Sequence, residues 1–110
     1  MGHLITPEFE ELFVNHTRYS QIDTTDPLVI AKLYDQFSPA VWFLTEYNSH
    51  FKVAFGYITG IHTGRFGYVS IEKLEKIKFS IIDTFKIKQD WSFSKKPLSE
   101  ALRIHREKKR

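Results

Sequence analysis

The sequence predicts a single α+β domain, in which a mainly antiparallel sheet of four to five strands carries about three short helices. The chain has 110 residues, which is close to the commonest size of one domain. Residues 41–71 hold the densest aromatic and β-branched content, which is typical of a central sheet. Apolar residues at helical spacing occur near residues 7–14, 71–78 and 97–107, around this stretch.

The composition is that of an ordinary globular protein. Hydrophobic residues make up 42% of the chain and charged residues 26%, which excludes a disordered chain and a membrane protein. There is no cysteine, so disulfides, thiolate metal sites and cysteine nucleophiles are excluded. The chain has no apolar run of membrane-spanning length and no signal-peptide pattern at its start. We therefore expect a cytoplasmic protein that does not interact with membranes.

The net charge of +3 comes from the C-terminus. The last eight residues carry +4, so residues 1–102 carry −1. We predict a nearly neutral globular domain over residues 1–102 and a basic tail over residues 103–110. The basic residues of the tail are Arg103, Arg106, Lys108, Lys109 and Arg110.

The starts of the three helices follow from their capping residues. Thr6 followed by Pro7 is an N-cap with proline at the first helical position. Ser70 is the expected cap of the second helix, and Pro97 the expected first residue of the third. Each segment has an apolar stripe, so we expect each helix to pack on the sheet.

The strands are predicted from β-branched runs separated by turns. The first two form a hairpin about a turn near Ser38 or Pro39. The third has large side chains at odd positions and slim ones at even positions, so another element can approach the slim side closely. The predicted strands cover residues 28–34, 41–47, 51–59 and 66–69, with one or two irregular strands around residues 84–87.

The triplet Phe-Gly-Tyr occurs twice, at residues 55–57 and 66–68. Each glycine is expected where another backbone comes close or a bulge forms. Aromatic residues make up 15% of the chain, which suits an aromatic sheet core. We expect Trp91 and Phe93 to anchor the irregular segment, and the core to contain Phe43, Phe55, Tyr57, Tyr68, Leu74 and Leu102.

Lys32 and Glu46 have the same parity about the predicted hairpin turn, so they are expected on one face of the sheet and within reach of each other. The favoured interpretation is a cross-strand ion pair. The alternative is a small enzyme with a Lys/Glu/Asp site that Asp83 or Asp90 completes.

No metal site or cofactor is predicted. The five histidines, at positions 3, 16, 50, 62 and 105, lack the spacing of a two-ligand helical site. The glycine loop at residues 60–65 is too far from a helix start to hold a phosphate group.

Several motifs occur in a distinctive order along residues 26–100. They are Asp26-Pro27-Leu28 with Lys32, followed by residues 42–47, 55–60, 67–75, 90–93 and 96–100. In this order they resemble a bacterial domain-of-unknown-function family of small proteins common on plasmids, integrated elements and phages, sometimes beside anti-restriction genes. The resemblance implies the same fold and a mobile-element context, and it supplies no catalytic residues. This chain departs from the family pattern at His62 and Arg65, where acidic residues are usual, and in its basic tail.

The leading functional hypothesis is a non-catalytic module that binds a protein partner. In the mobile-element context that the resemblance implies, it would be a counter-defence factor that inhibits a host nuclease or a CRISPR-type complex. The aromatic excess and the lack of an active-site motif support binding. The residues expected to contact the partner are Tyr47, His62, Arg65 and Trp91.

The alternative is a nucleic-acid-binding protein that uses the basic tail. Its arginines and lysines would neutralise phosphates, and Arg65 or exposed tyrosines would add stacking. Basic residues at a helix C-terminus are also favoured by the helix dipole alone, so the pattern indicates this function only weakly.

Overall fold

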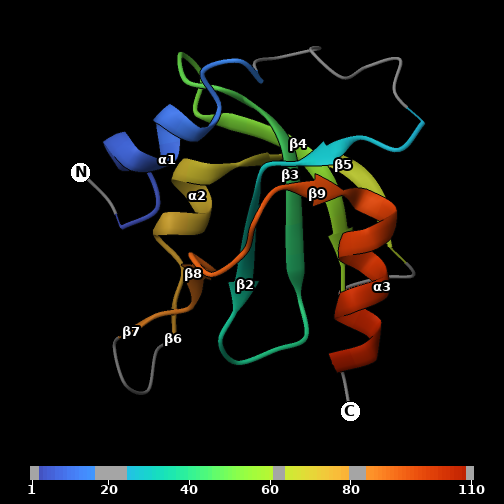
Figure 1. Ribbon diagram of the computed structural model, residues 1–110. Coiled ribbons are helices and arrows are strands. Elements are labelled where there is room, and N and C mark those ends of the chain that lie inside the picture. Colours follow the sequence, from blue (N-terminus) through green and yellow to red (C-terminus); the bar gives the residue numbers. More distant parts are fainter. Residues whose placement is uncertain (1–2, 17–24, 61–63, 80–83, 109–110) are drawn as a thin grey trace.

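The computed structural model describes residues 3–16, 25–60, 64–79 and 84–108, and it confirms the α+β class (Figure 1). The central sheet has five antiparallel strands in the order β5-β4-β3-β2-β8. These strands are β2 (Ala31–Asp35), β3 (Val41–Asn48), β4 (Val53–Thr59), β5 (Arg65–Ser70) and β8 (Ile87–Gln89).

Two short ladders lie beside this sheet. β1 (Leu28–Val29) pairs with β9 (Lys96–Pro97), and β6 (Lys78–Phe79) pairs with β7 (Thr84–Phe85). The predicted strand at residues 28–34 is therefore divided between two ladders. Ile30 lies at the division, where its amide donates to the Leu44 carbonyl oxygen at 2.8 Å.

The three helices begin with side-chain caps, two of which the sequence predicts. The Thr6 hydroxyl accepts from the Phe9 amide at the start of α1 (Pro7–Leu12), and the Ser70 hydroxyl caps α2 (Ile71–Glu75). The cap of α3 (Leu98–Lys108) comes from Asp26, whose carboxylate accepts from the Ser99 amide at 2.9 Å and the Ser99 hydroxyl at 2.7 Å. These bonds lower the pKa of Asp26.

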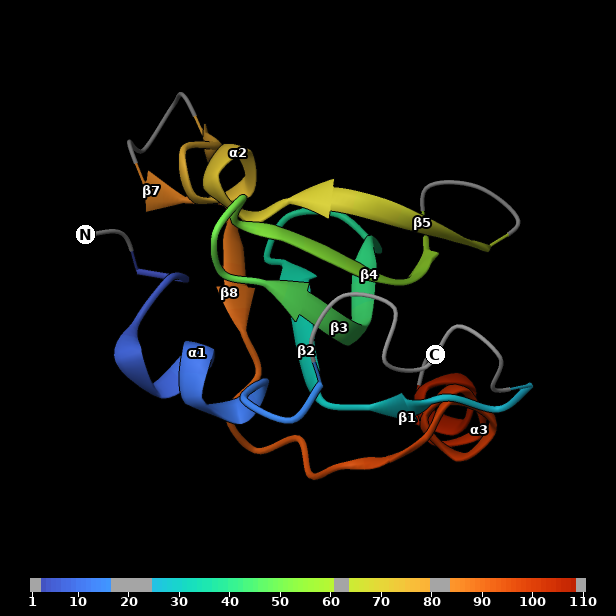
Figure 2. The ribbon, with the colours of Figure 1, turned by 90° about the horizontal axis from the view of Figure 1, so that it is seen from above.

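The helices cover both faces of the sheet (Figure 2). α1 and α2 lie on one side of β2 and β3, where they enclose the larger apolar core; this side is called the α1–α2 face. α3 lies on the opposite side, called the α3 face, over a smaller core. The smaller core contains Val29, Val41, Phe43, Leu98 and Ala101, with Tyr34, Tyr57, Phe93 and Leu102 partly buried against it.

A bulge at Thr45 sets the register of β3 against β4. Leu44 lies opposite Gly56, and Glu46 lies opposite Phe55, so Thr45 is the additional residue. Because side chains alternate along a strand, one additional residue exchanges the faces of all residues beyond it. Leu44 and Tyr47, three positions apart, therefore both enter the larger core.

The expected core is confirmed in part. Phe43 and Leu74 are buried, and Phe55, Tyr57 and Leu102 are partly buried. The placement of Tyr68 in the core was wrong, because its side chain is 59% exposed. On the α3 face, the residues packed around α3 come from β1 to β4 and from the turn after β8, and none comes from β5.

The irregular segment is anchored by only one of the two expected residues. The Phe93 ring packs against Phe43 with ring centres 6.4 Å apart. Trp91, also expected as an anchor, is 56% exposed, so that prediction was wrong. Trp91 lies in a turn just after β8, where the Ser92 amide donates to the Asp90 carboxylate and the Phe93 amide donates to the Asp90 carbonyl oxygen.

Candidate functional site

Four large side chains form an exposed aromatic surface on the α3 face. They come from β4, from β5 and from the turn between β3 and β4. This aromatic face consists of Phe51, Phe55, Phe66 and Tyr68. Phe55 lies opposite Tyr68 in the ladder, with ring centres 4.9 Å apart, and its ring also stacks with Phe66 at 5.8 Å. Phe51 and Tyr68 are each 59% exposed and Phe66 is 45% exposed. So much exposed aromatic surface in one place is typical of an interaction site.

The repeated Phe-Gly-Tyr triplets place this surface. Gly56 and Gly67 lie opposite each other in the ladder, so the aromatic residues flanking them project to the same face. Gly56 meets the expectation of a close backbone approach, because a Cβ atom there would overlap the Phe43 carbonyl oxygen. Gly67 does not, since a Cβ atom there would have only Ile58 Cδ1 at 3.5 Å, an ordinary contact.

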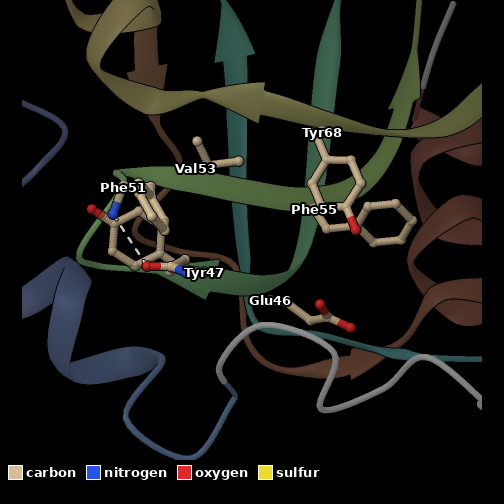
Figure 3. Close-up of a pocket in the computed structure, with 7 residues that line it drawn as sticks. Glu46, Tyr47, Phe51, Val53, Phe55 and Tyr68 are labelled. Carbon is tan, nitrogen blue, oxygen red and sulfur yellow. Dashed lines mark hydrogen bonds between the residues drawn. The ribbon is translucent and has the colours of Figure 1, made fainter.

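A pocket of about 270 Å³ opens at the aromatic face (Figure 3). The rings of Phe55 and Tyr68 lie together at one end, Phe51 lies at the other, and Val53 is between them. Glu46, which is buried, contributes a carboxylate to the lining. The pocket therefore combines mainly apolar walls with two polar residues, Glu46 and Asn48, a lining that suits a side chain with an apolar body.

Tyr47 also lines this pocket, but its ring belongs to the larger core. It is 2% exposed and lies 5.0 Å from the Phe9 ring and 5.7 Å from the Phe13 ring. Its hydroxyl donates to Glu10 Oε2 at 3.4 Å. Burial, and then the charge of Glu10, raise the pKa of Tyr47 far above its ordinary value of 10.0. A partner therefore has little access to this side chain.

The raised pKa of Tyr47 predicts a loss of stability in alkali. Above pH 10.0 the unfolded chain releases the phenolic proton, whereas the folded protein keeps it. The free energy of unfolding should then fall by up to about 1.4 kcal/mol per pH unit from this group. Urea unfolding between pH 9 and 11 should show a shallower fall for Tyr47→Phe than for the wild type. Tyr68→Phe, at an exposed position, should match the wild type, and equal slopes for both variants would contradict the assignment.

Of the four predicted partner-contact residues, the three that the structure describes do not lie together. Arg65 is exposed at the start of β5, opposite Ile58 in the ladder, so alternation places it on the other side of the strand from Phe66 and Tyr68. Trp91 lines a different pocket, with residues of α1 and with His16 and Lys95. His62 lies outside the described residues. The pattern that would have located the aromatic face is the alternation of large side chains on two paired strands, a pattern that was interpreted as core.

Lys32 lies in a second site, on the part of the α3 face next to α3. It is opposite Phe43 in the ladder, and its Nζ lies 3.6 Å from Asp90 Oδ2. Lys32 and Glu46 do lie on the same face, but their predicted pairing was wrong. The hairpin register is centred between Phe37 and Ser38, so Lys32 lies opposite Phe43, three positions before Glu46 on β3. Glu46 lines the aromatic pocket instead. The expected Lys/Glu/Asp site thus retains Lys32 and Asp90, and Asp83 lies outside the described residues.

The predicted basic residues at the C-terminus lie largely on a helix. α3 includes Arg103, Arg106 and Lys108, all exposed, and Arg103 forms an ion pair with Glu107 at 3.2 Å. Lys109 and Arg110 lie outside the described residues. The structure therefore presents an exposed basic helix end at this position.

Two general findings concern cofactors and membranes. Within the described ranges, no group of three or more histidine, aspartate or glutamate side chains could hold a metal ion. No helix in the described part of the chain is long and apolar enough to cross a membrane.

The fold and these surfaces define a small α+β protein with an aromatic face at one sheet edge and a polar pocket beside its last helix. A family model described as "Protein of unknown function (DUF2958)" matches residues 4–110. The chain therefore belongs to this family. No curated protein and no solved structure matches the chain.

Proposed function

We propose that the protein is a non-catalytic module that binds a protein partner through the aromatic face. The observation that carries this proposal is the exposure of Phe66 and Tyr68 on β5. This strand lies at one edge of the sheet (Figure 2). Aromatic side chains are enriched among the residues that dominate binding energies. Contact of these side chains with water is unfavourable in free energy, so covering them with a partner stabilises the complex.

The edge of β5 indicates how the partner binds. Its inner edge pairs with β4 over six residues, and no other strand in the described part of the chain pairs with its outer edge. Natural edge strands are commonly protected by charged side chains, proline or a bulge; β5 has no proline and no bulge, and its one charged residue, Arg65, lies at its first position. A segment of the partner would extend the sheet at this edge and place alternate side chains against Phe66 and Tyr68.

The biological role that we propose for this module is counter-defence. The resemblance of the motifs to proteins of plasmids, integrated elements and phages supports a role in the bacterial cytoplasm on behalf of a mobile element. The partner would be a host nuclease or a CRISPR-type complex, and the bound module would block its activity. Occlusion requires no catalytic group, which agrees with a surface built from apolar side chains.

The experiment compares capture by the wild type and by a variant of the face. Tagged wild-type protein should retain a stoichiometric partner from lysates of bacteria that express a restriction or CRISPR system. The double variant Phe66→Lys/Tyr68→Ser should bind the purified partner at least about tenfold more weakly, because central aromatic residues contribute about 2 kcal/mol or more each. Val14→Ser is the control, since Val14 is 65% exposed in the turn after α1.

Two outcomes would count against the proposal. One is the absence of a stoichiometric partner in every such lysate. The other is a partner that the double variant binds as tightly as the wild type and Val14→Ser do. A captured partner with no role in defence would agree with binding of a protein partner but contradict the counter-defence role.

A second candidate function is nucleic-acid binding, which the exposed basic end of α3 favours. If the five basic residues at positions 103–110 neutralise up to five phosphates, the logarithm of the duplex binding constant should fall with the logarithm of salt concentration at a slope of about −4 to −5. Arg103→Gln/Arg106→Gln should make the slope less steep by about 2. Lys73→Gln/Lys76→Gln, with the same charge change on α2, should leave it unchanged. Binding without salt dependence would exclude this function.

A further inference from the structure

A pocket of about 250 Å³ lies between α3, β2, β9 and the turn after β8. Its polar groups come from all four of these elements, so only the folded chain brings them together. A single buried water needs about 10 to 15 Å³, so the pocket has room for a ligand of many atoms. The polar lining consists of Lys32, Asp90, Ser92, Lys96, His105 and Lys108.

The pocket has an excess of positive charge. Three lysines face one carboxylate, that of Asp90, which gives a net charge of +2 with His105 neutral. Lys32 forms an ion pair with Asp90, with Nζ and Oδ2 3.6 Å apart. Within the described part of the chain, neither Lys96 nor Lys108 forms an ion pair with a carboxylate. Two ammonium groups therefore have no counter-charge at this pocket.

Asp90 organises the pocket rather than blocking it. Its Oδ1 accepts from both the amide and the hydroxyl of Ser92, at 3.0 Å and 2.5 Å, and its Oδ2 faces Lys32. Burial opposes ionisation of this carboxyl, but the bonds from Ser92 and the charge of Lys32 outweigh it and lower the pKa of Asp90. The carboxylate thus holds Lys32 and the turn at residues 90–92 in place.

Lys96 is also held in position. Its Nζ lies 4.2 Å from the centre of the Phe93 ring and 3.3 Å from the Ser94 hydroxyl. A cation over a ring face is attracted by the ring and keeps its remaining hydrogens for a ligand. The long side chain of Lys96 is therefore partly ordered before any ligand arrives, which lowers the entropic cost of binding.

We propose that this pocket binds the phosphomonoester group of a ligand, with Lys32, Lys96 and Lys108 as its cationic contacts. A phosphomonoester carries a charge of about −1.5 to −2 at neutral pH, which matches the excess of the pocket. The His105 ring supplies a further polar contact. The remainder of the ligand lies in an adjoining trough of about 490 Å³, which shares Lys32, Asp90 and His105 with the pocket and is bordered by Tyr34.

Two kinds of ligand contain a phosphomonoester group: a small phosphorylated metabolite such as a nucleotide, and the phosphorylated 5′ end of a nucleic acid. The pocket does not involve the aromatic face, so this inference is independent of the proposed protein partner. It also differs from binding along a nucleic-acid backbone, since internal phosphodiesters carry one charge each and contact exposed basic side chains without entering a pocket.

The test is an NMR titration of the whole ¹⁵N-labelled chain. The probes are inorganic phosphate, adenosine 5′-monophosphate, adenosine, and a short single-stranded oligonucleotide with and without a 5′-phosphate. We expect saturable shifts of the Ser92, Phe93 and His105 amide signals with adenosine 5′-monophosphate, reversed by competing phosphate, and none with adenosine. Tighter binding of the 5′-phosphorylated oligonucleotide than of the mononucleotide would identify nucleic-acid ends as the source.

Variants assign the contacts. Lys96→Gln/Lys108→Gln should weaken binding of adenosine 5′-monophosphate by at least about tenfold, because charge-assisted hydrogen bonds are lost. The matched control Lys73→Gln/Lys76→Gln removes the same charge from exposed positions on α2 and should leave affinity unchanged. The spectra themselves report whether each variant is folded.

Three results would overturn the proposal. The first is the absence of saturable shifts with every phosphorylated probe. The second is equal binding of adenosine and its monophosphate, which would show that the phosphate is not recognised. The third is equal weakening by the pocket variant and the α2 control, which would show a response to net charge alone.

Discussion

Phe43→Ala is expected to lower the free energy of unfolding by about 3–5 kcal/mol, the usual cost of truncating a buried aromatic residue. Phe43 is 1% exposed at the centre of the α3 face. Its ring lies 5.7 Å from the His105 ring and 6.4 Å from the Phe93 ring, so it joins α3 to the turn after β8. Truncation would leave a cavity between these elements. Urea denaturation monitored by circular dichroism measures the change.

Tyr68→Ala is the matched control for this prediction. Tyr68 was also expected in the core from its sequence pattern, but its side chain is 59% exposed. The loss should stay within about 1 kcal/mol, the scale of a cross-strand pair such as that with Phe55. Equal losses for both variants would contradict the placement of β5 at an uncovered edge.

Gly56→Ala is expected to destabilise the protein by about 1–3 kcal/mol or more, through overpacking. A methyl group at this position would overlap the Phe43 carbonyl oxygen and lie 2.8 Å from Leu44 Cα. Both atoms belong to the backbone of β3 just before the bulge at Thr45, so they cannot move without shifting the central strand. A lowered midpoint of urea unfolding, with an unchanged slope, would show this effect.

Gly67→Ala is the control from the second Phe-Gly-Tyr triplet. Its methyl group would meet only Ile58 Cδ1 at 3.5 Å, so the stability should change by less than about 0.5 kcal/mol. Because the two glycines lie opposite each other in the ladder, the comparison isolates the approach of β3. A large loss at Gly67 would mean that the triplet itself, rather than this approach, requires glycine.

The candidate sites could be predicted only in part from the sequence. The aromatic excess and the presence of Lys32 and Asp90 were visible, and so were the basic residues of α3. Lys96 and His105 were not linked to Lys32, because β9 and α3 meet β2 only through tertiary packing. The aromatic face was interpreted as core because alternation along a strand identifies the side chains of one face and does not show whether a helix covers that face.

The sequence by itself determined the fold class, the three helices and the approximate positions of the strands. These features depend on residues close in the chain: Thr6 and Ser70 accept hydrogen bonds from amides three residues ahead, and apolar spacing distinguishes helix from strand. Such local preferences act whatever the rest of the chain does.

The tertiary structure alone decided the register of β3, the exposure of β5 and the partners of the charged residues. The bulge at Thr45 depends on how two strands pack, and one additional residue exchanges the faces of every side chain beyond it. The cap of α3 comes from Asp26, 73 residues before Ser99. Contacts of this kind form only when distant segments meet, so their physical cause is the packing of the whole chain rather than any local pattern.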